Sequence, residues 1–105
     1  MEQPDNMSVQ VIENRVFIEG VILCLDDGQS EKMHHCVKIN ISRIEQVENY
    51  PDLVTVHGRH DFRMLVRKDD RANMDELIGK TFTCLVSWIM FDRLFMLKDS
   101  LQVIK

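Results

Sequence analysis

The feature of the sequence that most constrains its fold is a run of β-forming residues from 15 to 25 with a single glycine at its centre. The run is apolar at both alternating positions, and Gly20 interrupts it. A long strand that bends and serves two sheet surfaces has this pattern, because glycine is typical of a sharp bend or a close approach of backbones. The turn signal Asp26-Asp27-Gly28 ends the run. We therefore expect the first strand to be long and bent.

Later stretches alternate more simply. In residues 33–43, the side chains of Val37, Ile39 and Ile41 share one face, whereas Lys38 and Asn40 share the other, partly basic face. We predict further strands over residues 53–57, 80–91, 94–97 and 101–104, while residues 62–66 either extend or follow the strand at 53–57. Residues 71–78 carry acids after an aspartate cap and precede a glycine, which predicts a short helix.

This order of elements is that of the OB-fold, a small Greek-key barrel of five strands with one short helix between strands 3 and 4. An open sheet of four or five strands packed on one helix is the alternative. The polar residues 1–10 offer little to bury and are predicted to form a flexible tail. Residues 11–105 are predicted to form one domain, since a chain of 105 residues holds one modest core.

The net charge of −4 is unevenly distributed. Residues 1–31 hold seven acids and one base, whereas residues 32–67 hold six bases and four acids. The overall acidity therefore does not exclude a nucleic-acid partner for the middle of the chain. No apolar run approaches the roughly 18 residues of a membrane span, and the first residues lack the pattern of a signal peptide. Together with three cysteines that form no CxxC pair, these features predict a cytoplasmic protein with reduced thiols.

A resemblance to a known family rests on four stretches. Residues 14–22 (NRVFIEGVI), 35–43 (HCVKINISR), 53–58 (LVTVHG) and 76–88 (ELIGKTFTCLVSW) resemble strands of bacterial single-stranded-DNA-binding proteins in their apolar positions and glycines. The printed sequence closes on an expected strand and not on an acidic tail, so it is similar to the short, tail-less, PriB-like members. The resemblance implies an OB-fold, binding of single-stranded DNA and assembly into a homo-oligomer.

Binding of single strands without sequence preference requires cations along the backbone and flat side chains on which bases stack. The candidates are basic residues on the polar face of the second strand, a basic segment with histidines and a phenylalanine after residue 53, and a phenylalanine and an arginine in the turn at residues 91–93. They are Lys38, Arg43, His57, Arg59, Phe62, Arg63, Arg67, Phe91 and Arg93. Trp88 lies on the apolar side of its strand and is assigned to the core.

Neither a metal site nor a catalytic motif is predicted. His34 and His35 are adjacent on an expected strand, so their side chains point to opposite faces and cannot both reach one ion. The sequence contains no nucleophile elbow, P-loop or zinc-protease motif. We expect no cofactor and no enzymatic activity.

These observations predict a non-catalytic single-stranded DNA-binding protein that acts in DNA replication or mobile-element maintenance, with a replication protein as a further partner. The alternative is an OB-fold adaptor that binds another protein and has little or no affinity for nucleic acid. The acidic first third of the chain is the feature that keeps this alternative open.

Overall fold

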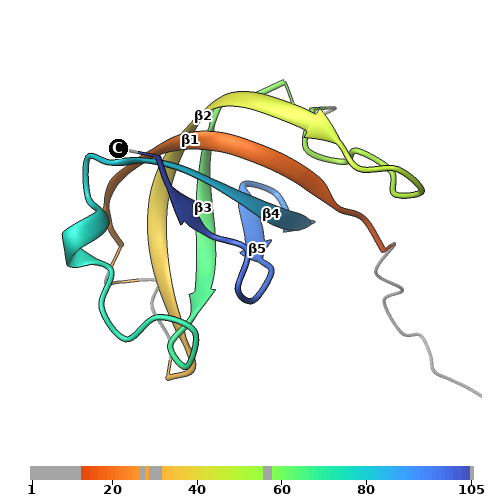
Figure 1. Cartoon of the computed structure of the whole chain (residues 1–105). Helices are drawn as coiled ribbons and strands as arrows, with labels where there is room; N and C mark the ends of the chain where they lie inside the picture. Colours follow the sequence, from red (N-terminus) through yellow and green to blue (C-terminus); the bar gives the residue numbers. More distant parts are fainter. Residues whose placement is uncertain (1–12, 27, 29–31, 56–57, 105) are drawn as a thin grey trace, which may run out of the picture.

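The computed structural model describes residues 13–26, 28, 32–55 and 58–104, and its strands form a closed barrel (Figure 1). The order around the barrel is β1-β2-β3-β5-β4, and β4 pairs with β1 to close it. β3 and β5 run parallel, whereas the other neighbours run antiparallel. The bounds are β1 Val16–Leu25, β2 His34–Gln46, β3 Asp61–Arg67, β4 Thr81–Met90 and β5 Arg93–Met96. The prediction of a five-stranded OB-fold-like barrel is confirmed, and an open sheet is excluded.

Closure depends on β1, which pairs with β2 along one edge and with β4 along the other. β1 curves around the barrel (Figure 1), and its register with β2 shifts between Glu19 and Gly20, where Ser42 of β2 is the extra residue of a bulge. At Gly20 the backbones approach so closely that an added Cβ would lie 2.4 Å from the carbonyl oxygen of Asn40. The predicted bend at this glycine is therefore confirmed.

The core fills the barrel with alternate residues of every strand. On β3 and β5 the inward residues are Phe62, Met64, Val66, Leu94 and Met96, all of them buried. Their neighbours in sequence must point outward, because side chains alternate along a strand. Trp88 packs against this core while remaining half-buried, so its assignment to the core is confirmed.

The strand predicted over residues 53–57 is absent from its described residues, whereas the strand considered for residues 62–66 is confirmed. β3 is Asp61–Arg67, and residues 53–55 are not a strand, while residues 56–57 lie outside the described residues. Asp52 explains the difference, because its Oδ1 accepts hydrogen bonds from the backbone nitrogens of Val54 and Thr55, both at 2.9 Å. Such side-chain contacts favour a turn over a strand. Val54 is nevertheless buried in the core, which explains why an apolar residue occupies this turn.

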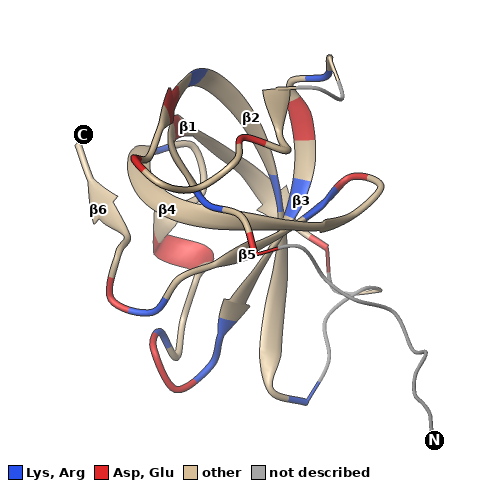
Figure 2. Ribbon diagram, turned by 90° about the vertical axis from the view of Figure 1, so that its right-hand side faces the viewer, with Lys and Arg blue, Asp and Glu red and all other residues tan. Residues whose placement is uncertain are grey.

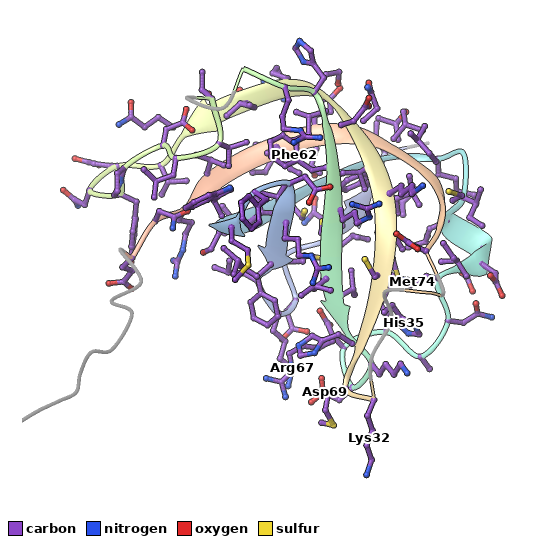
Figure 3. The ribbon with its side chains drawn as sticks, turned by 180° about the vertical axis from the view of Figure 1, so that it is seen from behind. Lys32, His35, Phe62, Arg67, Asp69 and Met74 are labelled. Carbon is purple, nitrogen blue, oxygen red and sulfur yellow. The ribbon has the colours of Figure 1, made fainter. Side chains whose placement is uncertain are left out.

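A short helical segment does lie between strands 3 and 4, but it is shorter than the predicted residues 71–78 and is a single 3₁₀ turn, η3 (Asp75–Leu77). The backbone nitrogen of Asp75 donates to Oδ1 of Asn73 at 2.8 Å, which forms a side-chain turn just before η3, and the N-cap residue Met74 makes no side-chain hydrogen bond. Met74 and Leu77 are buried, which fixes this segment by packing (Figure 3 labels Met74). Gly79 ends it with a φ of 83°, as predicted for a glycine after a helical turn.

The C-terminal pairing is shorter than predicted. Instead of a strand over residues 101–104, β6 (Gln102–Val103) adds two residues to β4 and lies outside the ring of five strands. The predicted tail, residues 1–10, lies outside the described residues.

We expect Gly20→Ala to destabilise the protein by about 3 kcal/mol, because the new methyl group would overlap the backbone of Asn40 and force two paired strands apart. The change in unfolding free energy is measured by urea denaturation. Gly28→Ala is the matched control, since its added Cβ would meet nothing closer than 3.9 Å. Equal stabilities for the two variants would contradict the role given to Gly20.

Candidate nucleic-acid interface

The outward residues of β2, β3 and β5 form one surface, which we call the β2–β3–β5 face. Strand register arranges it in rows, because Cys36 lies opposite Leu65 and Leu65 opposite Phe95. We call these three residues the apolar row. A cationic row on one side of it consists of Lys38, Arg63 and Arg93, and His34 lies opposite Arg67 on the other side.

Phe95 of the apolar row forms an aromatic pair with the neighbouring His34, which the sequence did not reveal. The rings of His34 and Phe95 have centroids 5.1 Å apart and are tilted by 58°, and both side chains are half-buried. Alternation in β5 indicates the outward direction of Phe95 between buried Leu94 and Met96. Its position beside His34, however, depends on the parallel pairing of β3 with β5, which no local pattern predicts.

Cys36 is buried although it lies on this outward side, whereas alternation alone would expose it. The backbone nitrogen of Asp26 donates to the carbonyl oxygen of Cys36 at 2.8 Å, which continues the pairing of β1 with β2, and the Asp26 side chain contacts Arg63 next to Cys36. Burial, followed by the negative charge of Asp26, raises the pKa of the Cys36 thiol. The apolar row is therefore open to solvent mainly around Leu65 and Phe95.

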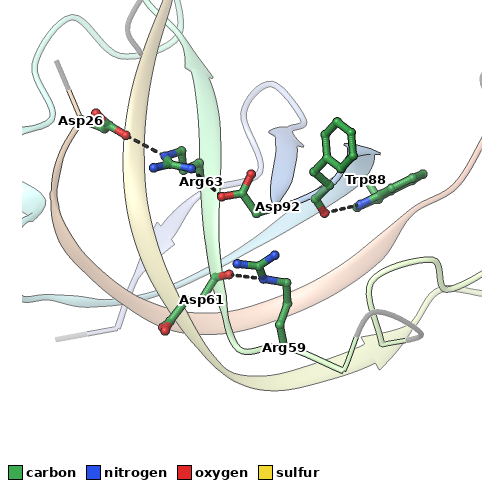
Figure 4. Close-up of polar contacts among 7 residues, drawn as sticks. Asp26, Arg59, Asp61, Arg63, Trp88 and Asp92 are labelled. Carbon is green, nitrogen blue, oxygen red and sulfur yellow. Dashed lines mark hydrogen bonds and ion pairs between the residues drawn. The ribbon is translucent and has the colours of Figure 1, made fainter. Parts of the chain in front are cut away.

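Arg63 is the most strongly paired cation of the face (Figure 4). Its Nε donates to Asp26 at 2.7 Å and its Nη1 donates to Asp92 at 2.6 Å. The hydrogen bond to Asp26 and the charge of Asp92 raise the pKa of Arg63 above its ordinary value. Because Asp26 follows β1 and Asp92 lies between β4 and β5, one arginine connects two loops at the edge of the face.

Two other predicted cations are also paired with carboxylates. Arg67 contacts Asp69 through two hydrogen bonds of 2.9 and 2.7 Å, close to the end of β3 (Figure 3). Arg43 contacts Glu19 and Glu45. β2 pairs with β3 only from His34 to Asn40, so Arg43 lies beyond the face. Acidic and basic residues are in fact interspersed around the barrel (Figure 2).

A groove of about 340 Å³ lies on the same side of the barrel and brings four predicted residues together: Lys38, Arg59, Phe62 and Arg63. Lys38 and Arg59 form no ion pair within the described part of the chain. The Nε of Arg59 instead donates to the carbonyl oxygen of Asp61 at 2.9 Å (Figure 4). The groove therefore contains cations that a phosphate can approach.

The prediction that Phe62 stacks on a base is wrong, because its side chain belongs to the core and is 2% exposed (Figure 3). The Cζ of Arg59 lies 5.6 Å from the centroid of the Phe62 ring and covers it from outside. Phe62 thus supports the groove from below. The alternation of β3, once its bounds are known, accounts for this burial.

Phe91 is the most exposed large apolar residue of the described chain, with 77% of its surface accessible. Its φ of 49° belongs to the tight turn between β4 and β5. The indole Nε1 of Trp88 donates to the carbonyl oxygen of Phe91 at 2.9 Å and thereby holds the turn (Figure 4). Arg93 follows on the face, and His57 lies outside the described residues.

No three His, Cys, Asp or Glu side chains converge as metal ligands within the described ranges. His34 contacts Phe95 outside the barrel, whereas Nε2 of His35 donates to the carbonyl oxygen of Arg71 at 2.9 Å. The two histidines thus have separate partners, as their adjacent positions on a strand predict.

Comparison with protein-family models, with curated proteins and with solved structures found no match to this chain. Within the described residues, no helix is long and apolar enough to cross a membrane.

We expect a thiol reagent to label only Cys24 in the folded protein, because Cys24 is exposed whereas Cys36 and Cys84 are buried. Burial also raises the pKa of both buried thiols, which lowers the fraction of reactive thiolate. Labelling is followed by mass spectrometry before and after unfolding, with Cys24→Ser as the control. Rapid labelling of Cys36 in the native state would show that its thiol is not buried as the structure describes.

Proposed function

We propose that the protein is a non-catalytic single-stranded DNA-binding protein that uses the β2–β3–β5 face. The observation that carries this proposal is the apolar row with the His34–Phe95 pair, which lies next to the cations Lys38, Arg63 and Arg93. Single-strand binding requires this combination of flat surfaces for bases and cations for the backbone. Arg63 on this face also contacts Asp26, directly after β1, and Asp92, between β4 and β5, and OB-folds commonly bind ligands at these two connections.

In this arrangement bases stack on Phe95 and His34 while phosphates approach Lys38 and Arg59 in the groove. The expected affinity is low, since one or two stacked bases contribute roughly 1–3 kcal/mol each. Assembly into a homo-oligomer, which the family resemblance implies, would raise the apparent affinity by presenting several faces to one strand. The same resemblance supports a place in DNA replication or mobile-element maintenance, with a replication protein as partner.

A second candidate function is that of an adaptor for another protein. It is favoured by the exposed apolar side chains Phe91, Met90 and Leu23, which are 77%, 49% and 49% accessible. Exposed aromatic and aliphatic anchors are typical of protein interfaces. An adaptor of this kind would bind its partner with little dependence on Phe95 or on salt.

We expect Phe95→Ala to weaken binding to oligo-dT by about fivefold to a hundredfold, because it removes one stacking surface. Fluorescence anisotropy with labelled oligo-dT, compared with a duplex of the same length, measures the loss. Tyr50→Ala is the matched control, since it removes an aromatic ring that packs against Arg15 outside the β2–β3–β5 face. Absence of any preference for the single strand at low salt would exclude the DNA-binding function and leave the adaptor.

The structure separates two cations that share one strand, Lys38 and Arg43. We expect Lys38→Glu to weaken oligo-dT binding, because Lys38 lines the groove. Arg43→Glu makes the same charge change beyond the face and should leave binding within about twofold of wild type. Equal losses in the two anisotropy titrations would place the DNA elsewhere on the barrel.

A further inference from the structure

We infer that Arg63 is the central phosphate-binding residue of the β2–β3–β5 face and that Asp26 and Asp92 compete with the phosphate for it. The two aspartates would then be the residues that set the affinity and salt dependence of the site. This role of Arg63 rests on the proposed binding of single strands by the same face. The inference adds to that function the ligand group that Arg63 binds, the phosphate, and the two carboxylates that compete with it.

The three side chains are positioned by backbone contacts. Asp26 is anchored by its backbone nitrogen, which donates to the carbonyl oxygen of Cys36 at 2.8 Å on β2. Asp92 is anchored by its carbonyl oxygen, which accepts from the backbone nitrogen of Arg63 at 2.7 Å. The two carboxylates therefore reach Arg63 from separate connections of the barrel, one after β1 and one between β4 and β5 (Figure 4).

Arg63 remains accessible in spite of this double pairing. Its side chain is 35% exposed, compared with 17% for Asp26 and 19% for Asp92. A guanidinium binds carboxylate and phosphate oxygens with the same donor geometry, so a phosphate competes for the donors that the aspartates occupy. Arg63 also lies between Lys38 on β2 and Arg93 on β5. A strand that crosses the cationic row must therefore pass over it.

The competition has a distinct thermodynamic signature. Binding of a phosphate by an ordinary surface cation releases salt ions, which steepens the log–log salt dependence by about 0.7 for each contact on a single strand. At Arg63 the phosphate displaces two tethered carboxylates, and the salt cations that these carboxylates then attract offset those released from the phosphate, so this contact adds little to the slope. Removal of both negative charges should restore the release of salt ions.

The test compares wild type with Asp26→Asn, Asp92→Asn and the double variant in oligo-dT anisotropy over a range of salt concentrations. We expect each single variant to bind up to about fivefold more tightly, since an exposed ion pair opposes its displacement by about that factor. The double variant should also show a slope steeper by about 0.7. Adding Arg63→Gln to the double variant should remove this increase.

The matched control is the pair Asp75→Asn and Glu76→Gln, which changes the net charge equally on exposed residues of η3. It should raise affinity less and leave the slope unchanged. Three outcomes would overturn the inference. They are an unchanged salt slope in the double aspartate variant, an affinity gain in that variant no larger than in the control, and a loss of affinity in both single variants. Thermal melts of the single variants show whether any loss of oligo-dT affinity reflects unfolding. A single variant that remains folded then decides whether removal of the aspartate charge raises or lowers the affinity.

The two levels of the proposal fail differently. If wild type prefers oligo-dT over duplex but the aspartate variants do not differ from the control, only the role of Arg63 is overturned. If neither wild type nor any variant prefers oligo-dT at low salt, the proposed function and the inference are both overturned.

Discussion

The close approach of β1 and β2 at Gly20 is the contact on which the rest of the barrel depends. β1 pairs with β2 on one edge and with β4 on the other, which requires a bend that a side chain at Gly20 would block. Closure through β1 brings β5 alongside β3, although the two strands are far apart in the sequence. That parallel pair places Phe95 beside Leu65 and Arg93 beside Arg63. The candidate interface is thus a consequence of barrel closure.

Local alternation was sufficient to predict the bent first strand, the second strand, the strand before the Asp92-Arg93 turn and the OB-like order. It failed where side chains compete with the backbone for hydrogen bonds. Asp52 and Asn73 accept hydrogen bonds from nearby backbone nitrogens; a turn stands where a strand was expected, and a single 3₁₀ turn stands where a longer helix was expected. In both segments the apolar residues indicated burial correctly, since Val54 and Met74 are buried. A single buried residue in a loop, however, produces the same local pattern as a strand or a helix.

The site was predictable only in part, for a related reason. Lys38 could be assigned to the polar face from the alternation of one strand, and Arg59 and Arg63 from their basic segment; all three line the groove. Phe62 was misassigned because the bounds of β3 decide which of its residues point inward. The pairing of His34 with Phe95 depends on contacts between distant strands, and such register carries no signal in a single local stretch.

The distribution of charge on the face determines what kind of ligand it favours. A surface that attracts any polyanion needs unpaired cations, yet Arg63 and Arg67 are each held by carboxylates of neighbouring loops. Duplex DNA offers phosphates but hides its base faces, so it gains little from such a surface. A single strand offers the faces of its bases as well, and these can use Phe95 and His34. The pairing of these arginines is therefore the reason why we propose a single strand and not a duplex as the ligand of a protein whose net charge is −4.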